Sequence, residues 1–145
     1  MPRRRRCKQV YTRYMNIYIA DIEKETLKNS NYRKVEYTTH NSQLVFMTVR
    51  PGDEIGNEIH GVDQFIRVES GEAQSILNNG EKTEMLTKNM AIIIPAGIWH
   101  NIKNIGDEDL KVYTIYSGPT HLKDTTQKTK ADEIEDTWDG KTNLR

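Results

Sequence analysis

The sequence has little of what marks secreted, membrane-spanning or nucleic-acid-binding chains. Cys7 is its single cysteine, so an internal disulfide is excluded and a reducing, intracellular compartment is expected. No apolar run approaches the ~20 residues that a bilayer-spanning helix needs, and the basic start lacks the apolar stretch of a secretory signal. Lys and Arg total 21, as do Asp and Glu, and this balance argues against a dedicated nucleic-acid binder. We expect a cytoplasmic protein.

A chain of 145 residues fits one domain around one hydrophobic core. Residues 1–14 (MPRRRRCKQVYTRY) have no apolar periodicity, so we expect a disordered extension or sequence upstream of a second start at Met15. The alternative is a patch for weak contact with nucleic acid, formed by Arg3, Arg4, Arg5 and Arg6. At the other end, residues 119–145 are polar and are expected to form an arm whose last part, 131–145, is a short helix or a frayed tail.

Short strands separated by turn residues dominate the middle of the chain. The expected strands are 43–49, 64–68, 72–77, 81–86, 90–94 and 110–116. The Asn78-Asn79-Gly80 stretch predicts a hairpin, because Asn and Gly tolerate positive φ angles. Residues 90–94 (MAIII) are apolar throughout and predict a fully buried strand. Many evenly spaced short strands predict an all-β sandwich or barrel.

The expected barrel covers residues 41–118, and a different pattern precedes it. Residues 17–27 predict a short strand and then a helical turn, with Asp21 as the N-cap. We expect the segment 15–40 to pack on the barrel or to be exchanged between two copies of the chain.

Four polar residues are predicted to face the same interior space. Glu58 and His60 are two residues apart on a strand, and Gln64 keeps the same parity, so all three point to one face. His100 comes much later, after a tight turn at 95–97 that would aim it inward. Two imidazoles with oxygen donors suit Mn, Fe, Ni or Zn. The sequence predicts one divalent metal ion bound by Glu58, His60, Gln64 and His100.

The turns around these residues form two motifs. Residues 51–71 (PGDEIGNEIHGVDQFIRVESG) contain a Pro-Gly turn, a Glu-x-His pair, Gln64 and a closing glycine. Residues 89–104 (NMAIIIPAGIWHNIKN) contain Pro-x-Gly, then His100, then Asn104. Together they resemble the two motifs of the cupin family, in the right order. The resemblance covers roughly residues 40–118 and extends to small bacterial cupins with a Glu-x-His-x3-Gln motif, through the stretches IYSGP (115–119) and KTK (128–130).

The resemblance implies a cupin double-stranded β-helix, or jelly-roll, barrel with a short N-terminal helical segment and a C-terminal arm. It also implies a homodimer, since cupin barrels commonly dimerise. The chain departs from the usual ligand set, because Glu58 replaces the first histidine and Gln64 replaces the glutamate. The set still offers two nitrogens and two oxygens with one negative charge. Without Gln64, the remaining residues would match the two-His-one-carboxylate set of non-haem iron oxygenases.

Several functions fit such a site. One is an enzyme acting on a small anionic or sugar-like substrate at a net positive metal centre. Iron or manganese would favour dioxygenase chemistry, and zinc would favour a sugar-phosphate isomerase similar to the type I phosphomannose isomerases, which are also cupins. The alternatives are a non-catalytic cupin that binds or senses a small ligand, and a scaffold without metal. An unused buried Glu-His pair would be costly, which argues against the scaffold.

Residues near the second motif are candidates to line the pocket, together with one upstream histidine: Tyr113, Tyr116, Trp99 and His40. The alternative for the aromatic residues is packing in the core or in a dimer interface. For His40, and for His121, the alternative is exposure in a loop. Arg67 and Glu69 fall on the outer face by strand parity and are expected to face an interface or solvent.

Overall fold

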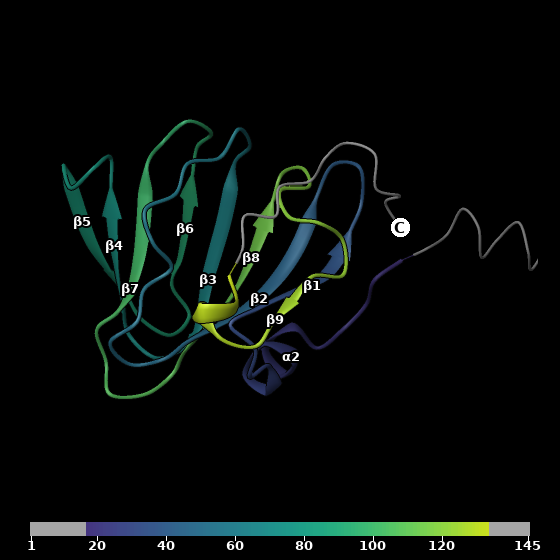
Figure 1. Cartoon of the computed structure of the whole chain (residues 1–145), viewed down its shortest axis with the longest axis horizontal. Coiled ribbons are helices and arrows are strands. Elements are labelled where there is room, and N and C mark those ends of the chain that lie inside the picture. The colour runs from purple at the N-terminus through teal and green to yellow at the C-terminus, as the bar shows by residue number, and fades with distance from the viewer. Residues whose placement is uncertain (1–16, 134–145) are drawn as a thin grey trace, which may run out of the picture.

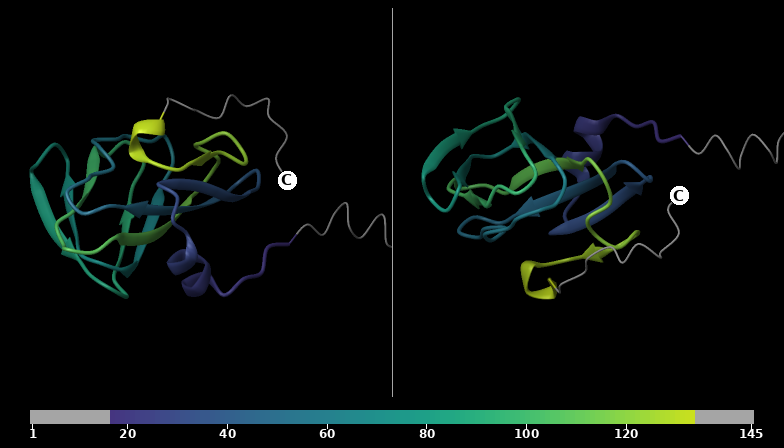
Figure 2. Two further views of the ribbon diagram at one scale, coloured as in Figure 1. Left: turned by 60° about the horizontal axis from the view of Figure 1, so that its bottom comes forward. Right: turned by 90° about the horizontal axis from the view of Figure 1, so that it is seen from above.

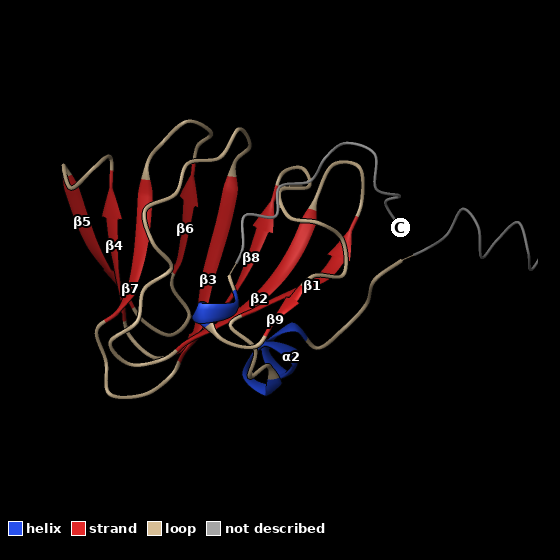
Figure 3. Cartoon of the chain, viewed as in Figure 1, coloured by secondary structure: helices blue, strands red, loops and turns tan. Residues whose placement is uncertain are grey.

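Two antiparallel sheets enclose the core in this computed structural model, which describes residues 17–133 (Figure 1). The larger sheet has the strand order β6-β3-β8-β2-β1-β9, and the smaller has the order β5-β4-β7. The strands are β1 (Arg33–Thr38), β2 (Gln43–Val49), β3 (Gln64–Ser70), β4 (Ala73–Leu77), β5 (Lys82–Leu86), β6 (Ala91–Ile94), β7 (His100–Asn104), β8 (Leu110–Tyr116) and β9 (Thr126–Gln127). Helical structure in the described part is confined to α2 (Ile22–Lys28) and the 3-10 turn η1 (Lys130–Asp132), and the all-β prediction is confirmed (Figure 3).

The core is built from alternate residues of both sheets. Val45, Ile66 and Val112 come from the larger sheet, and Ala73 and Ile102 from the smaller one. Successive side chains on a strand point to opposite faces, so one face of each sheet supplies the core. Any polar residue that shares this parity is therefore carried into the interior.

The N-terminal segment adds a helix and a strand to the sandwich. The Asp21 side chain accepts a hydrogen bond from the Lys24 backbone N–H at 3.1 Å, which confirms the predicted N-cap, whereas residues 17–21 form no strand. Helix α2 lies outside the sandwich (Figure 2). The larger sheet extends past both expected bounds of the barrel, because β1 pairs with β2 and β9 pairs with β1.

Strand β6 differs from its prediction. The run 90–94 was expected to be fully buried, but β6 is one of the two edge strands of the larger sheet. Ile94 is 2% exposed and its neighbour Ile93 is 69% exposed. The prediction of full burial is wrong, because an apolar run does not reveal whether its strand lies at the centre or the edge of a sheet.

Between residues 17 and 133, no helix has both the length and the apolar character needed to cross a bilayer. The basic extension with Cys7, the arginines at 3–6 and the tail from residue 134 onward lie outside the described residues.

Candidate metal centre

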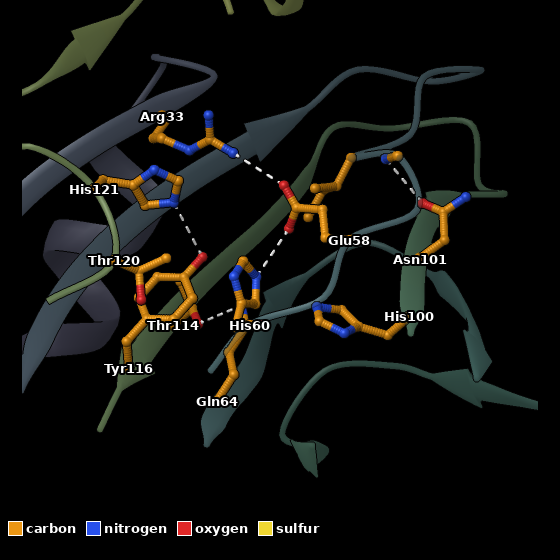
Figure 4. A network of polar contacts seen from close by, with 12 residues as sticks. Arg33, Glu58, His60, Gln64, His100, Asn101, Thr114, Tyr116, Thr120 and His121 are labelled. Atoms are coloured by element: carbon orange, nitrogen blue, oxygen red, sulfur yellow. Dashed lines mark hydrogen bonds and ion pairs between the residues drawn. The ribbon is translucent and has the colours of Figure 1, made fainter. Parts of the chain in front are cut away.

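Glu58, His60 and His100 meet between the two sheets (Figure 4). One ligand atom of each lies within 4.8 Å of the others. The backbone of Glu58 exchanges two hydrogen bonds with that of His100, at 2.8 and 2.9 Å, and this bridge holds the first motif against β7. The Glu58 Oε2 atom lies 3.3 Å from His60 Nε2, and the two imidazole centroids are 5.2 Å apart. Glu58 and His60 lie in the loop before β3 and not on the predicted strand, so the backbone bridge between Glu58 and His100 brings the three predicted residues together.

His100 is held with one ring nitrogen available. Its Nδ1 lies 2.9 Å from the carbonyl oxygen of Ile98, so Nδ1 carries the hydrogen and donates it there. The Nε2 atom is buried and has no hydrogen-bond partner among the described residues. Burial lowers the pKa of His100, which keeps the ring neutral and the Nε2 lone pair free. A neutral imidazole oriented by a backbone carbonyl is the state in which histidine binds metals.

Gln64 presents an oxygen in a comparable way. Its Nε2 donates a hydrogen bond to Thr114 Oγ1 at 3.0 Å, across the β3–β8 pair. Its Oε1 is buried and has no hydrogen-bond partner among the described residues. An amide whose nitrogen is fixed and whose oxygen is unpaired fits the role of an oxygen ligand.

The residues present fit a divalent ion. Two donors that each bind an ion at about 2.1 Å stand roughly 3.0–3.4 Å apart at right angles or tetrahedral angles. The 3.3 Å between Glu58 Oε2 and His60 Nε2 falls in this range. Imidazole nitrogens with carboxylate and amide oxygens suit manganese, iron, nickel and zinc. The chain therefore has a His/Glu group able to hold such an ion.

Arg33 is a site residue that the sequence-based reasoning missed. It is 2% exposed, and its Nη2 lies 3.6 Å from Glu58 Oε1 (Figure 4). Its Nη1 donates to Gln127 Oε1 at 2.9 Å and to Glu133 Oε2 at 3.2 Å. A sequence pattern could have identified Arg33: it lies two residues before the core residue Val35 on the same strand, so both side chains point to the inner face.

The ionisation of Glu58 follows from these neighbours. Burial acts to raise the pKa of its carboxyl group, but the hydrogen bond with His60 and the positive charge of Arg33 outweigh burial. The pKa of Glu58 is therefore lowered, and the carboxylate stays ionised, as a metal ligand must be.

Of the predicted pocket residues, Tyr116 lies against the cluster. Its ring meets the His60 ring edge-on, with centroids 5.2 Å apart, and its hydroxyl lies 3.3 Å from His121 Nε2. His121 is buried, in contrast to the expected loop exposure. It comes from the C-terminal arm, so that arm contributes to the interior of the sandwich.

The other pocket candidates lie outside the cluster. Tyr113 is on the outer face of β8, where its ring contacts Phe65 at 6.0 Å between centroids. Trp99 is exposed, and His40 is exposed in the turn between β1 and β2. Glu69 was expected to face an interface or solvent; within this chain it is buried and paired with Arg67.

Comparison with known proteins identifies the family to which this architecture belongs. The model of the cupin domain family matches residues 45–116. A protein of Acanthamoeba polyphaga mimivirus, described as uncharacterized, is 44% identical over 108 residues, which are 72% of this chain and 68% of that protein. The chain belongs to the cupin family. This cupin is also 36% identical over 124 residues to the uncharacterized protein YrkC of Bacillus subtilis, covering 81% of this chain and 66% of YrkC.

Solved structures agree with this assignment. The crystal structure of the Bacillus halodurans protein BH2720 superposes with a TM-score of 0.77 at 38% identity, covering 79% of this cupin and 91% of that chain. A cupin-family protein with a double-stranded β-helix fold from Methanocaldococcus jannaschii superposes with a TM-score of 0.56 at 14% identity. The match covers 63% of this cupin and 84% of that chain, and it shows the fold alone. The resemblance and the fold class predicted from the two motifs are confirmed. The chain spans about two thirds of the length of its curated relatives.

Proposed function

We propose that this cupin binds one divalent transition-metal ion through Glu58, His60, His100 and the carbonyl oxygen of Gln64. The supporting observation is a pair of buried, unpaired atoms, His100 Nε2 and Gln64 Oε1. A buried polar atom without a partner costs about 1–3 kcal/mol, and a metal ion would satisfy both at once. Their outer partners, the Ile98 carbonyl and the Thr114 hydroxyl, hold each donor in the orientation that ligation requires.

We further propose that the metal centre binds a small anionic or sugar-like substrate. When bound, a divalent ion supplies Lewis-acid polarisation of a coordinated substrate oxygen. The four ligands carry one formal negative charge, that of Glu58, so the loaded centre has a net positive charge that attracts anions. Arg33 keeps Glu58 ionised, and the Ile98 carbonyl keeps His100 neutral.

The metal's identity distinguishes between the candidate reactions. Iron or manganese favours a dioxygenase, and zinc favours an isomerase of the sugar-phosphate type. Turnover of no substrate together with tight ligand binding would favour a sensor or binding module. The cytoplasmic location and the homodimer stay predictions, and light scattering on the purified chain tests the homodimer.

Elemental analysis tests the metal centre. The parent protein, purified without a histidine tag, is compared with Glu58→Ala, His100→Ala and His40→Ala. His40 is a matched control, since it is an exposed histidine outside the cluster. We expect about one ion per chain in the parent and in His40→Ala, and a small fraction of that in the other two variants. No transition metal in the parent, or equal metal in all four proteins, would contradict the proposal.

A further inference from the structure

An apolar groove opens between β5 and β6, the outermost strands at one edge of each sheet. Its volume is about 380 Å³, within the range of small-molecule pockets. The side chains that line it are predominantly aliphatic and include Leu77, Leu86, Met90, Ile92, Ile94 and Ile98. Apart from Ile98, whose backbone carbonyl orients His100, the proposed function uses none of these residues.

The groove adjoins the metal centre through the register of the strands. Ile94 on β6 is directly opposite Gln64 on β3, and Leu77 on β4 is directly opposite His100 on β7. Directly opposite residues of an antiparallel pair project to the same face. Two lining residues of the groove are therefore same-face neighbours of two proposed ligands. A third, Ile98, accepts the hydrogen bond that orients His100.

The unpaired atoms of these ligands belong to the strands next to the groove walls, on the same interior face. Gln64 Oε1 and His100 Nε2 are both buried and lack hydrogen-bond partners within residues 17–133. The walls offer hydrocarbon, and the neighbouring strands β3 and β7 carry the proposed ligands Gln64 and His100. A molecule that contacts both the groove and the metal centre must carry oxygen donors at one end and an apolar body at the other.

The outer rim of the groove is apolar and open to solvent. Ile93 is 69% exposed, Met85 is 47% exposed and Met90 is 43% exposed. Flexible methionine side chains adapt to ligands of differing shape. Lys82 and Glu84, which are exposed on β5, also line the groove, and such charges on an edge strand disfavour pairing with another chain. A small molecule therefore suits the groove better than an added strand does.

We propose that the ligand of the metal centre is an amphipathic organic acid, which binds the ion through its oxygens and lays an apolar tail in the groove. This inference rests on the proposed function and names its substrate class. A sugar phosphate, which is polar along its whole length, would leave the aliphatic walls without contact.

Straight-chain carboxylates test this proposal. Acetate, hexanoate and decanoate are titrated calorimetrically into the metal-loaded protein, whose metal content is measured on the same sample. Affinity should rise about threefold to fourfold for each added methylene until the groove is full. The variant Ile92→Trp, which fills the groove, should abolish this rise. Ile115→Trp is the matched control, because Ile115 lies on the outer face of β8, and it should keep the rise.

The outcomes separate the two proposals. If the parent protein holds one ion per chain but binds acetate and decanoate with equal affinity, the groove proposal is overturned. The proposed metal centre is unaffected by that result. Absence of metal from the parent would overturn the proposed function instead. In His100→Ala, all three carboxylates should bind more weakly by a similar factor, with the rise per methylene retained. Unchanged affinities in that variant would separate the groove from the metal centre and overturn the inference.

Discussion

At the level of single residues, Gln64 depends on Thr114 for its orientation. Thr114→Val removes the acceptor of the Gln64 amide hydrogen while keeping the side-chain shape. We expect metal affinity to fall about 10-fold, since outer partners of metal ligands have effects of this order. Competition against a chelator measures the metal affinity of the variant and of the parent.

Thr48→Val is the control for that change. Thr48 is also buried, and its hydroxyl donates to the Asn29 carbonyl oxygen at 2.7 Å, away from the cluster. This variant should lose about 1 kcal/mol of stability and keep the parent's metal affinity. Unchanged metal affinity in Thr114→Val would remove Gln64 from the ligand set.

Arg33 is the buried cation between two carboxylates. Arg33→Met leaves Glu58 and Glu133 without it, and losing one partner of a buried ion pair costs about 3–5 kcal/mol. Because the carboxylates are 21% and 31% exposed, water screens them, and we expect a loss of about 2–3 kcal/mol in the free energy of unfolding. Denaturant titration measures it. Arg33→Lys should recover little of this lost stability, since an ammonium cannot reproduce the forked contacts of a guanidinium. A loss below about 0.5 kcal/mol would contradict this role.

The residues of the site differ in how far the sequence predicts them. Glu58, His60 and His100 were predicted from residue spacing and one tight turn, which are local features, although Glu58 and His60 lie in a loop and not on the expected strand. Arg33 also obeys parity, but it precedes the expected start of the barrel. Its partner Glu133 is 100 residues away, and no local pattern predicts a contact over that separation. Nonlocal polar partners are therefore the part of the site that needed the structure.

At the level of elements, two turns with the same backbone angle have different room for a side chain. Gly71, between β3 and β4, and Gly80, in the β4–β5 hairpin, both have φ of 93°. An added Cβ at Gly71 would lie 2.8 Å from the Asp109 carbonyl oxygen and 2.9 Å from Leu110 Cα, whereas nothing lies within 4 Å at Gly80.

Alanine at each position separates backbone strain from steric clash. Gly80→Ala should cost about 1–2 kcal/mol, the cost of positive φ alone. Gly71→Ala must also displace backbone atoms of the neighbouring segment and should cost about 4 kcal/mol or more. Denaturant midpoints of the two variants give the comparison, and equal costs would show that the segment at 109–110 moves freely.

The elements also show where sequence patterns stop being informative. The Asn78-Asn79-Gly80 hairpin is confirmed, because its positive φ angles are a property of those residues themselves. The edge position of β6 depends on which strand pairs with β3, and the apolar run at 90–94 does not indicate this pairing. The groove at this edge was consequently absent from the sequence-based predictions.

At the level of the whole molecule, the candidate ligands tie together separate parts of the chain. Gln64 begins β3, His100 begins β7, and Glu58 lies in the loop between β2 and β3. The C-terminal arm adds to this connection, since Lys130 Nζ donates to the Ile55 carbonyl oxygen at 2.8 Å and Glu133 accepts from Tyr32 at 2.6 Å. A metal ion at this junction would connect the larger sheet, the smaller sheet and the first motif.

Metal binding should therefore stabilise the whole fold. An ion that binds only the folded state stabilises it by about 2.7 kcal/mol at a hundredfold excess over its Kd. For a chain of this length, that corresponds to a rise of roughly 10 °C in the melting temperature. Calorimetry with and without Mn²⁺ or Zn²⁺ measures the shift, and a chelator should reverse it. Glu58→Ala and His100→Ala should lose the shift, and His40→Ala should keep it. Because the ligands come from both sheets, the shift should appear in a single unfolding transition, and an equal shift in Glu58→Ala would place the ion elsewhere.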